Sequence, residues 1–369
     1  MKYFLIAGEA SGDLLGASLM EGILATDPAA EFAFWGGDKM AAVAPGMLQH
    51  FKDITIMGFV EVLLNIRTIQ ANMRRCEAQF SVYKPDVLIL IDYPGFNMRM
   101  AKAARKYNIK TCYFIAPKIW AWNEKRGKQL EANVDLLLLI FPFETAYFKK
   151  WKVNAKYIGN PLYDQISTFQ KSTNFKIEHK LENKPIIALL PGSRKQEVKR
   201  MLPTMLLLAQ AYPQYQFIIA GSPSLGEAYY QQFLTQDQAA IIFDETRNIL
   251  AHSEAAVVCS GTASLETAFM NIPQVCVYAA QPLTYFIASL LVKVKWASLV
   301  NLNLNREAVK ELIQNNYQLS QLKQEFEAIL LGGNKRNKLL EDYQELHHLF
   351  QNKNAALLAS AEIDKLIKA

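Results

Sequence analysis

The sequence predicts an α/β protein built around two parallel β-sheets, one in each half of the chain. Short apolar runs of strand length alternate with longer amphipathic runs, which is typical of repeated strand–helix units. This alternation stops once and starts again near Lys184. The chain has 369 residues, enough for two domains that each bury a core of their own. We therefore expect two Rossmann-like domains.

The apolar runs of the first half predict strands, and helical patterns fill the intervals between them. These strands cover residues 3–7, 32–35, 87–91, 111–115 and 136–140. In the second half the predicted strands cover residues 186–190, 217–220, 240–243, 255–259 and 275–277.

The boundary between the domains is expected within residues 167–184, which are polar and read as a linker or a helix end. After Glu307 the pattern predicts helices only, over residues 308–313, 319–331 and 339–367. The expected domains are residues 1–170 and 171–340, with C-terminal helices over residues 341–369 that cross back to the first domain.

The composition is that of a folded globular protein, with 51% apolar and 20% charged residues. A net charge of +6 favours an anionic partner, such as a phosphate-bearing substrate or an acidic lipid surface. No basic tract is interleaved with aromatic residues, which argues against nucleic acid. The four cysteines are scattered, which fits a reducing cytoplasm, and no apolar run is long enough to predict a membrane span.

Two loops that follow strands of the first half carry candidate catalytic residues. In residues 8–13, Gly8 and Gly12 permit a tight turn, and Ser11 and Asp13 either cap the next helix or contact a substrate. Asp92 follows the strand 87–91, at the edge where parallel sheets bind ligands. Its carboxylate either accepts a proton from a substrate hydroxyl or closes an Asx turn.

A third loop of the first half contains Trp120 and Trp122. Aromatic faces suit sugar rings and acyl chains, although packing in the core is the default interpretation for one tryptophan.

Two loops of the second half are suited to a diphosphate. Ser193 and Arg194 lie in a Pro-Gly-Ser-Arg segment between a strand and a helix. Backbone amides and a guanidinium at such a place are suited to binding an anion. The alternative is that Arg194 forms a surface salt bridge. Ser260, Gly261 and Thr262 offer hydroxyls and amides at the start of another helix.

Glu266 lies one turn into that helix, where it can hold both ribose hydroxyls of a nucleotide. The alternative for this segment is simple helix capping. The sequence has no D-x-D or Walker pattern, and its five histidines are dispersed apart from His347 and His348. We expect no metal and no cofactor.

Taken together, these segments resemble the lipid-A-disaccharide synthase family. The resemblance rests on residues 8–13, 117–122, 190–194 and 260–266, in this order over nearly the whole chain, with further matches at residues 141–144, 298–301 and 311–314. It implies a GT-B glycosyltransferase whose two Rossmann-like domains face a cleft, with the acceptor site in the first domain and the UDP-sugar site in the second. Asn301 and Gln314 then join Arg194, Ser260, Gly261, Thr262 and Glu266 around UDP.

The resemblance also implies the reaction. UDP-2,3-diacylglucosamine would donate its sugar, with inversion, to the 6-hydroxyl of 2,3-diacylglucosamine 1-phosphate, giving a β-1,6 disaccharide and UDP. Such an enzyme would be cytoplasmic and peripherally attached to the inner membrane, and a homodimer is compatible with it. The apolar segment 59–66, followed by Arg67, Arg74 and Arg75, suits an acyl-chain site or an interfacial helix, or else a buried core helix.

The sequence departs from the family pattern at two places. The second acid of the family's Asp-x-Pro-Asp-Phe-Asn pattern is Gly95 here, so the general base falls to Asp92 or Asp13. The family's Gly-His-Pro is Gly159-Asn160-Pro161, which removes an imidazole. Two alternative functions stay open. The first is another UDP-sugar GT-B enzyme, such as a cell-wall N-acetylglucosaminyltransferase or a UDP-N-acetylglucosamine 2-epimerase. The second is a non-catalytic nucleotide-sugar binding protein.

Overall fold

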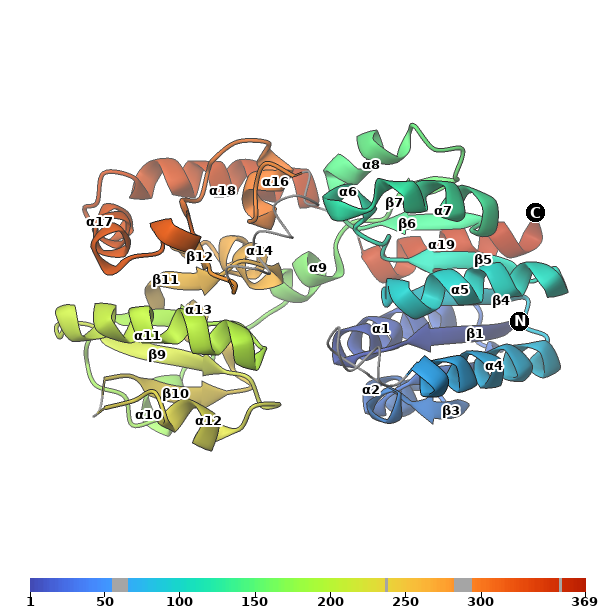
Figure 1. Ribbon diagram of the computed structural model, residues 1–369, viewed down its shortest axis with the longest axis horizontal. Helices are drawn as coiled ribbons and strands as arrows, with labels where there is room; N and C mark the ends of the chain where they lie inside the picture. Colours follow the sequence, from blue (N-terminus) through green and yellow to red (C-terminus); the bar gives the residue numbers. More distant parts are fainter. Residues whose placement is uncertain (55–65, 236–237, 282–293, 352–353) are drawn as a thin grey trace. The chain divides into compact units, whose positions relative to one another are not determined.

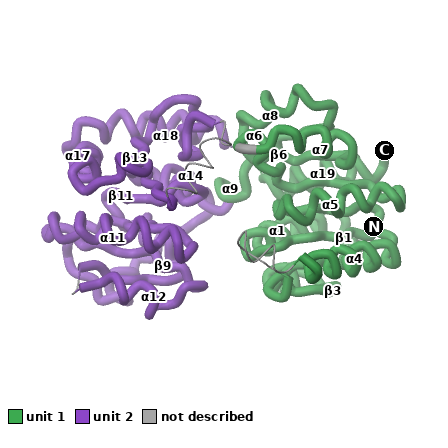
Figure 2. The backbone as a smooth tube through the Cα atoms, in the orientation of Figure 1, with its two compact units in different colours: residues 1–164, 352–369 green, residues 165–351 purple. Residues whose placement is uncertain are grey.

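The computed structural model describes residues 1–54, 66–235, 238–281, 294–351 and 354–369 (Figure 1). The chain forms two compact units (Figure 2). Unit 1 comprises residues 1–164 and 352–369, and unit 2 comprises residues 165–351. Within the described ranges, no helix has both the length and the apolar character needed to cross a membrane. The apolar segment 59–66 lies outside these ranges except for Ile66.

Unit 1 is built on a parallel sheet with the strand order β3-β2-β1-β4-β5-β6-β7. Its strands are β1 (Lys2–Ala7), β2 (Glu31–Gly36), β3 (Met47–His50), β4 (Val87–Ile91), β5 (Lys110–Phe114), β6 (Leu136–Leu139) and β7 (Ala155–Tyr157). The expected strands of the first half are confirmed, whereas β3 and β7 were not predicted. Both are short edge strands with polar residues, so neither shows an apolar run.

Helices cover both faces of this sheet. One face packs against α1 and α19, whose Ala355, Ala359 and Ile363 join the core of β1 and β4. On the other face, the ring of Phe80 in α4 meets that of Phe4 edge to face. The helices of unit 1 are α1 (Ala10–Thr26), α2 (Asp38–Val43), α4 (Ile66–Tyr83), α5 (Pro94–Ala104), α6 (Ile119–Trp122), α7 (Gly127–Asn133), α8 (Pro142–Phe148) and α19 (Ala355–Lys368), and α9 (Pro161–Ser167) contains the division between the units.

Unit 2 repeats the arrangement with the strand order β10-β9-β8-β11-β12-β13, again all parallel. Its strands are β8 (Ile186–Leu190), β9 (Gln216–Gly221), β10 (Ala240–Phe243), β11 (Ser253–Cys259), β12 (Gln274–Tyr278) and β13 (Glu311–Ile313). The helix expected over residues 308–313 is wrong. Its last three residues instead extend the sheet, with Leu312 paired with Val277, because pairing with β12 overrides a short pattern that is ambiguous between helix and strand.

The helices of unit 2 are α10 (Phe175–Glu178), α11 (Lys195–Ala211), α12 (Glu227–Gln231), α13 (Thr246–Ala251), α14 (Thr262–Phe269), α16 (Leu299–Leu304), α17 (Leu319–Ile329) and α18 (Arg336–Phe350). Residues 167–184 are more than a linker, because α10 places Phe175 fully inside the core. The long helix expected over residues 339–367 is two helices: α18 in unit 2 and α19 in unit 1. Asn354 caps the start of α19 by accepting a hydrogen bond from the Leu357 amide.

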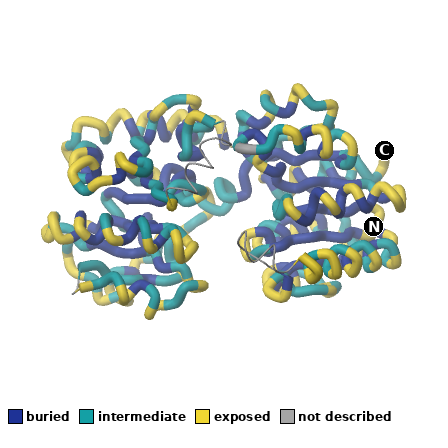
Figure 3. The backbone as a smooth tube through the Cα atoms, in the orientation of Figure 1, coloured by how far each residue is buried: buried dark blue, intermediate teal, exposed yellow. Residues whose placement is uncertain are grey.

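Each sheet has one place where the strand order reverses. It lies between β1 and β4 in unit 1, and between β8 and β11 in unit 2. The central strands β1, β4, β8 and β11 are buried along most of their length, so the groups that can meet a ligand lie in the loops at their ends (Figure 3). In open parallel sheets, ligands bind at the carboxyl ends of the strands on either side of such a reversal. The two reversals therefore define one ligand-binding edge in each unit.

Candidate functional site

The ligand-binding edge of unit 1 brings together the loops that follow β1 and β4. A Cβ atom built on Gly8 would lie 2.3 Å from the ring of Tyr93, so only glycine allows these loops to approach so closely. Gly12 packs against Ala7, where a Cβ would lie 3.3 Å from the Ala7 Cβ. Ser11 is exposed beside them. Two segments that are more than 80 residues apart in the sequence thus form one surface.

Asp13 lies next to this surface, in the first turn of α1, but serves the fold. Its side chain is buried and accepts hydrogen bonds from the amides of Gly37 (2.7 Å), Lys39 (3.0 Å) and Met40 (3.1 Å). These amides belong to the start of α2, where the first N–H groups of a helix have no partner within the helix. The carboxylate therefore caps α2, and its oxygens already accept three hydrogen bonds.

Asp92 occupies the end of β4 in a strained backbone conformation. Its φ angle is +45° and that of Tyr93 is +46°, a region that residues other than glycine rarely adopt. Burial raises the pKa of the Asp92 carboxyl, while the Lys118 ammonium and the Tyr93 amide oppose this rise. The Tyr113 hydroxyl donates to the Asp92 carbonyl oxygen at 2.7 Å and holds this turn. Strain and a raised carboxyl pKa at a ligand-binding edge are typical of a catalytic base.

Trp120 is a buried side chain rather than an exposed platform. Its Nε1–H donates to Glu144 Oε1 at 3.0 Å, and its ring meets that of Phe143 edge to face at 5.0 Å. Glu144 also accepts the amides of Phe141 and Ile140 at the start of α8, so it caps this helix. Asn160, at the position of the family's histidine, is likewise structural: it donates to the Ile140 carbonyl and accepts the Leu162 amide.

Complete burial raises the pKa of Glu144 from 4.5 to about 7. The native protein therefore keeps this proton in a pH range where the unfolded chain has lost it. As pH rises from about 4.5 through about 7, the free energy of unfolding should fall, by at most about 3 kcal/mol. Glu144→Gln removes this titration. The free energy of unfolding of the wild type, compared with that of the variant, should therefore fall between about pH 5 and 8, as measured by denaturant titrations at each pH. A difference that stays constant over this range would contradict the raised pKa.

The ligand-binding edge of unit 2 places the loops after β8 and β11 side by side, because Leu190 pairs with Val258. Arg194 is the N-cap residue of α11, and its side chain is 74% exposed. The Ser193 and Arg194 amides, which the sequence suggested for a diphosphate, donate to Glu197 Oε2 at 3.1 and 3.2 Å. The guanidinium lies 3.4 Å from Glu197 Oε1. The carboxylate of Glu197 thus occupies the amide pair, while the guanidinium remains accessible.

The start of α14 supplies the second half of this edge. Gly261 has a φ angle of +148°, which favours glycine, and among the described residues a Cβ there would meet nothing within 4 Å apart from its chain neighbours. Thr262 is exposed at the first position of α14. The Ser260 hydroxyl donates to the Ala297 carbonyl at 2.8 Å, which ties this loop to the segment before α16. The first amides of α14 and the exposed Thr262 are therefore the groups best placed to meet an anion.

Glu266 lies one turn further along α14, in an ion pair with Arg247. Nε of Arg247 is 3.0 Å from Glu266 Oε1, and the glutamate side chain is 17% exposed. The same guanidinium donates to Gln165 Oε1 at 2.6 Å. Arg247 fixes one carboxylate oxygen, and the exposed fraction of the side chain leaves a face for a ligand.

Asn301 and Gln314 hold backbone segments in place. The Asn301 amide group donates to the Val309 carbonyl and to Glu311, both at 2.8 Å, and its oxygen accepts the amides of Ala308 and Val309. Fully buried and with both donors and both lone pairs in use, it has no group left for UDP. Gln314 accepts the Ala280 amide at 3.0 Å and so anchors the chain that follows β12.

The sequence did not single out three charged residues, Lys118, Glu197 and Arg247, which lie near Asp92, Arg194 and Glu266 respectively. Glu197 has a local signal, since a glutamate three residues after the N-cap is a capping position. Arg247 has none, because it meets Glu266 across 19 residues of sequence.

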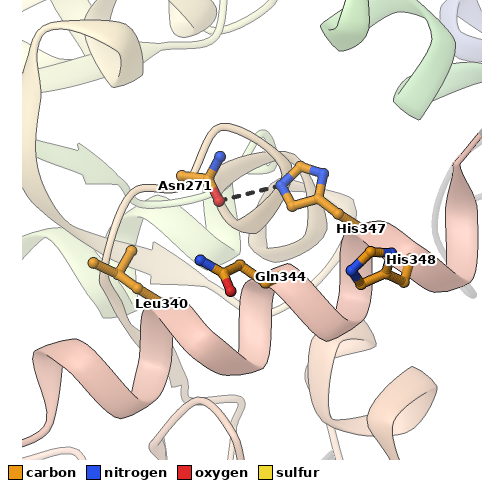
Figure 4. A pocket seen from close by; sticks show the side chains of 5 residues that line it. All are labelled: Asn271, Leu340, Gln344, His347 and His348. Carbon is orange, nitrogen blue, oxygen red and sulfur yellow. Dashed lines mark hydrogen bonds between the residues drawn. The ribbon is translucent and has the colours of Figure 1, made fainter.

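Unit 2 also has an open pocket of about 430 Å³ lined by Asn271, Leu340, Gln344, His347 and His348 (Figure 4). Asn271 lies beyond the end of α14 that is opposite to Gly261, so this pocket is away from the ligand-binding edge. His347 Nε2 donates to Asn271 Oδ1 at 3.2 Å. Across the described residues, no three His, Cys, Asp or Glu side chains are grouped to hold a metal ion.

Two Rossmann-like units with these ligand-binding edges define the GT-B class, which includes glycosyltransferases and sugar-nucleotide epimerases. Solved structures share the fold over the full chain at low sequence identity. The UDP-GlcNAc 2-epimerase from Neisseria meningitidis bound to UDP-GlcNAc aligns with a TM-score of 0.68 at 11% identity, covering 100% of both chains. The sucrose-phosphate synthase from Thermosynechococcus elongatus aligns with a TM-score of 0.60 at 14% identity, covering 100% of this chain and 99% of the other.

The family model for lipid-A-disaccharide synthetase matches residues 3–363. The chain is 32% identical to a lipid-A-disaccharide synthase of Koribacter versatilis, over 98% of both chains, and 34% identical to one of Trichlorobacter lovleyi, over 89% of this chain and 88% of the other. The chain therefore belongs to the lipid-A-disaccharide synthetase family and is a glycosyltransferase of lipid A biosynthesis.

Proposed function

We propose that the enzyme transfers 2,3-diacylglucosamine from UDP to the 6-hydroxyl of 2,3-diacylglucosamine 1-phosphate, with inversion. The observation that carries this proposal is the complementary chemistry of the two ligand-binding edges. Unit 1 presents a carboxylate with a raised pKa, Asp92, and unit 2 presents an accessible guanidinium, Arg194, beside the helix start at Gly261. The epimerase from Neisseria meningitidis, of the same fold, was solved with UDP-GlcNAc bound, which supports a UDP-sugar as donor.

In the proposed reaction, unit 1 binds the acceptor and unit 2 binds the donor. Asp92 takes the proton of the acceptor 6-hydroxyl as its oxygen attacks the anomeric carbon. The bond from that carbon to the β-phosphate oxygen of UDP breaks, and the electron pair leaves on that oxygen. Attack from the opposite side converts the α-linked donor into a β-1,6 disaccharide. Arg194 and the first amides of α14 stabilise the negative charge that develops on the diphosphate.

The test is to incubate the protein with UDP-2,3-diacylglucosamine and 2,3-diacylglucosamine 1-phosphate and to detect the disaccharide by mass spectrometry. Its β linkage is read from the anomeric coupling constant. UDP-N-acetylglucosamine alone is the control, since several proteins of this fold are 2-epimerases. Formation of UDP-N-acetylmannosamine without any disaccharide would overturn the proposal, as would UDP binding without transfer.

Replacing Glu266 with Ala should weaken UDP binding about tenfold or more, because a carboxylate that holds ribose hydroxyls contributes charge-assisted hydrogen bonds. Isothermal titration calorimetry with UDP measures this. Arg247→Met is the matched control: it removes the ion pair with Glu266 but keeps the carboxylate, so it should retain most of the UDP affinity. Unchanged affinity of Glu266→Ala would remove this residue from the ribose role, and an equal loss in both variants would mark the ion pair as structural.

A further inference from the structure

Glu197 places a negative charge where the sequence suggested that a diphosphate binds. Its Oε2 accepts the amides of Ser193 and Arg194, and its Oε1 faces the Arg194 guanidinium. Gly192, with a φ angle of +103°, makes this possible, because a Cβ there would lie 2.5 Å from Glu197 Oε2. The conformation of the loop thus leaves room for the Glu197 carboxylate and holds it by two hydrogen bonds.

This carboxylate lies over the ligand-binding edge of unit 2. After burial, Glu197 is the strongest cause that raises the pKa of Cys259, at the end of β11, to about 12, and Arg194 opposes it. Burial also raises the pKa of Tyr278, at the end of β12; Glu197 adds to this rise, and Arg194 again opposes it. The side chain is only 21% exposed. Glu197 and Arg194 therefore lie close enough to the ends of β11 and β12 to act on groups at this edge.

We propose that Glu197 is an internal competitor for the Arg194 guanidinium, and that it keeps the affinity for the UDP product low. This inference rests on the proposed function, in which a UDP-sugar binds at this edge. When the donor binds, its diphosphate draws the guanidinium away from Glu197, whose other oxygen stays on the loop amides. After transfer, the carboxylate competes for the guanidinium again and promotes release of UDP.

The contacts have the strengths that such an exchange requires. The ion pair is long, at 3.4 Å, and its arginine is 74% exposed, so it is weak and is broken at little cost. A diphosphate offers the guanidinium two parallel charge-assisted hydrogen bonds, which are stronger. The amide contacts, at 3.1 and 3.2 Å, instead cap α11 and keep the carboxylate in place. Glu197 is thus a positioning residue that acts through Arg194.

The test is calorimetry of UDP binding to the wild type and to Glu197→Gln. Glutamine keeps an oxygen that can accept the loop amides but loses the charge, so UDP should bind about fivefold more tightly. Product inhibition by UDP should strengthen by the same factor, and the gain should shrink at high salt. Damage to the loop would weaken binding instead, so a gain separates this proposal from a purely structural role. If the glutamine variant does not fold, Glu197→Asp, which shortens the reach to Arg194, should show a gain in the same direction.

Glu307→Gln is the matched control. Glu307 forms an ion pair with the same spacing, to Lys310, near the amino end of β13 and so away from the ligand-binding edge; its loss should leave UDP affinity unchanged. In an Arg194→Met background, most of the gain from Glu197→Gln should disappear. If the wild type does not bind UDP, the proposed function fails. If the wild type binds and Glu197→Gln binds equally or more weakly, or if the gain persists in full without Arg194, the competitor role is overturned.

Discussion

Replacing Asp92 with Asn is expected to lower kcat by roughly two orders of magnitude or more while UDP affinity stays nearly intact. Asparagine has the same size but cannot accept the proton of the acceptor hydroxyl. Asp92 is the acid at this strand end, since the next position that the family pattern marks is Gly95, which has no side chain to accept a proton. Steady-state kinetics with the disaccharide assay, together with calorimetry of UDP binding, measure both effects.

The pH dependence of the wild type gives a second readout for Asp92. Because burial raises the pKa of this carboxyl, the acid limb of the kcat/KM profile should lie above the ordinary range of an aspartate. Activity is present above that pKa and is lost as pH falls through it. Lys118 opposes the rise, so Lys118→Met should move the acid limb to still higher pH.

Asp13→Asn is the control for the base assignment. Its carboxylate caps α2 through three amides, so the variant should lose about 1–3 kcal/mol of stability. Any loss of turnover should then accompany a lower melting temperature, whereas Asp92→Asn should melt close to the wild type. Near-normal turnover of Asp92→Asn combined with an inactive, fully stable Asp13→Asn would move the base to Asp13.

Replacing Arg194 with Ala is expected to reduce kcat about a hundredfold or more, because the guanidinium stabilises charge that develops as UDP leaves. Stability should hardly change, since the side chain is 74% exposed and its ion pair is long. Arg194→Lys keeps the charge but not the paired geometry, so it should recover only part of the rate. Single-turnover kinetics isolate this step. A rate for Arg194→Ala within a few-fold of the wild type would exclude Arg194 from stabilising the leaving group.

The fold could be predicted from the sequence because buried parallel strands read as continuous apolar runs. β4 and β8 are such runs, and both were predicted. β13 could not be, because three residues next to a helix-like pattern become a strand only through pairing with β12. Phe175 was missed for a similar reason: one apolar residue in a polar segment shows no periodicity, although it fills the core.

The loops that meet at the strand ends could be predicted from the sequence, but their individual contacts could not. Glycines and strand ends correctly marked the segments that meet, as Gly8 and Tyr93 do. A sequence does not show which acceptors are already in use. Asn301 and Asp13 look like free polar groups until their partners are seen, and Glu197 is visible only as a capping residue. Long-range hydrogen bonding decides which polar side chains remain for a ligand.

The chain leaves unit 1 at residue 164 and returns to it at residue 352, and this order has a consequence for biosynthesis. A ribosome finishes all of unit 2 before it makes α19. Until then α1 lacks its neighbour, including the contact of Gly22 with Ala356 and the Thr26–Ser360 hydrogen bond of 2.6 Å. The apolar face that receives Ala359 and Ile363 stays open to water during that time. We therefore expect the amino-terminal half of the nascent polypeptide to need chaperone protection until α19 emerges.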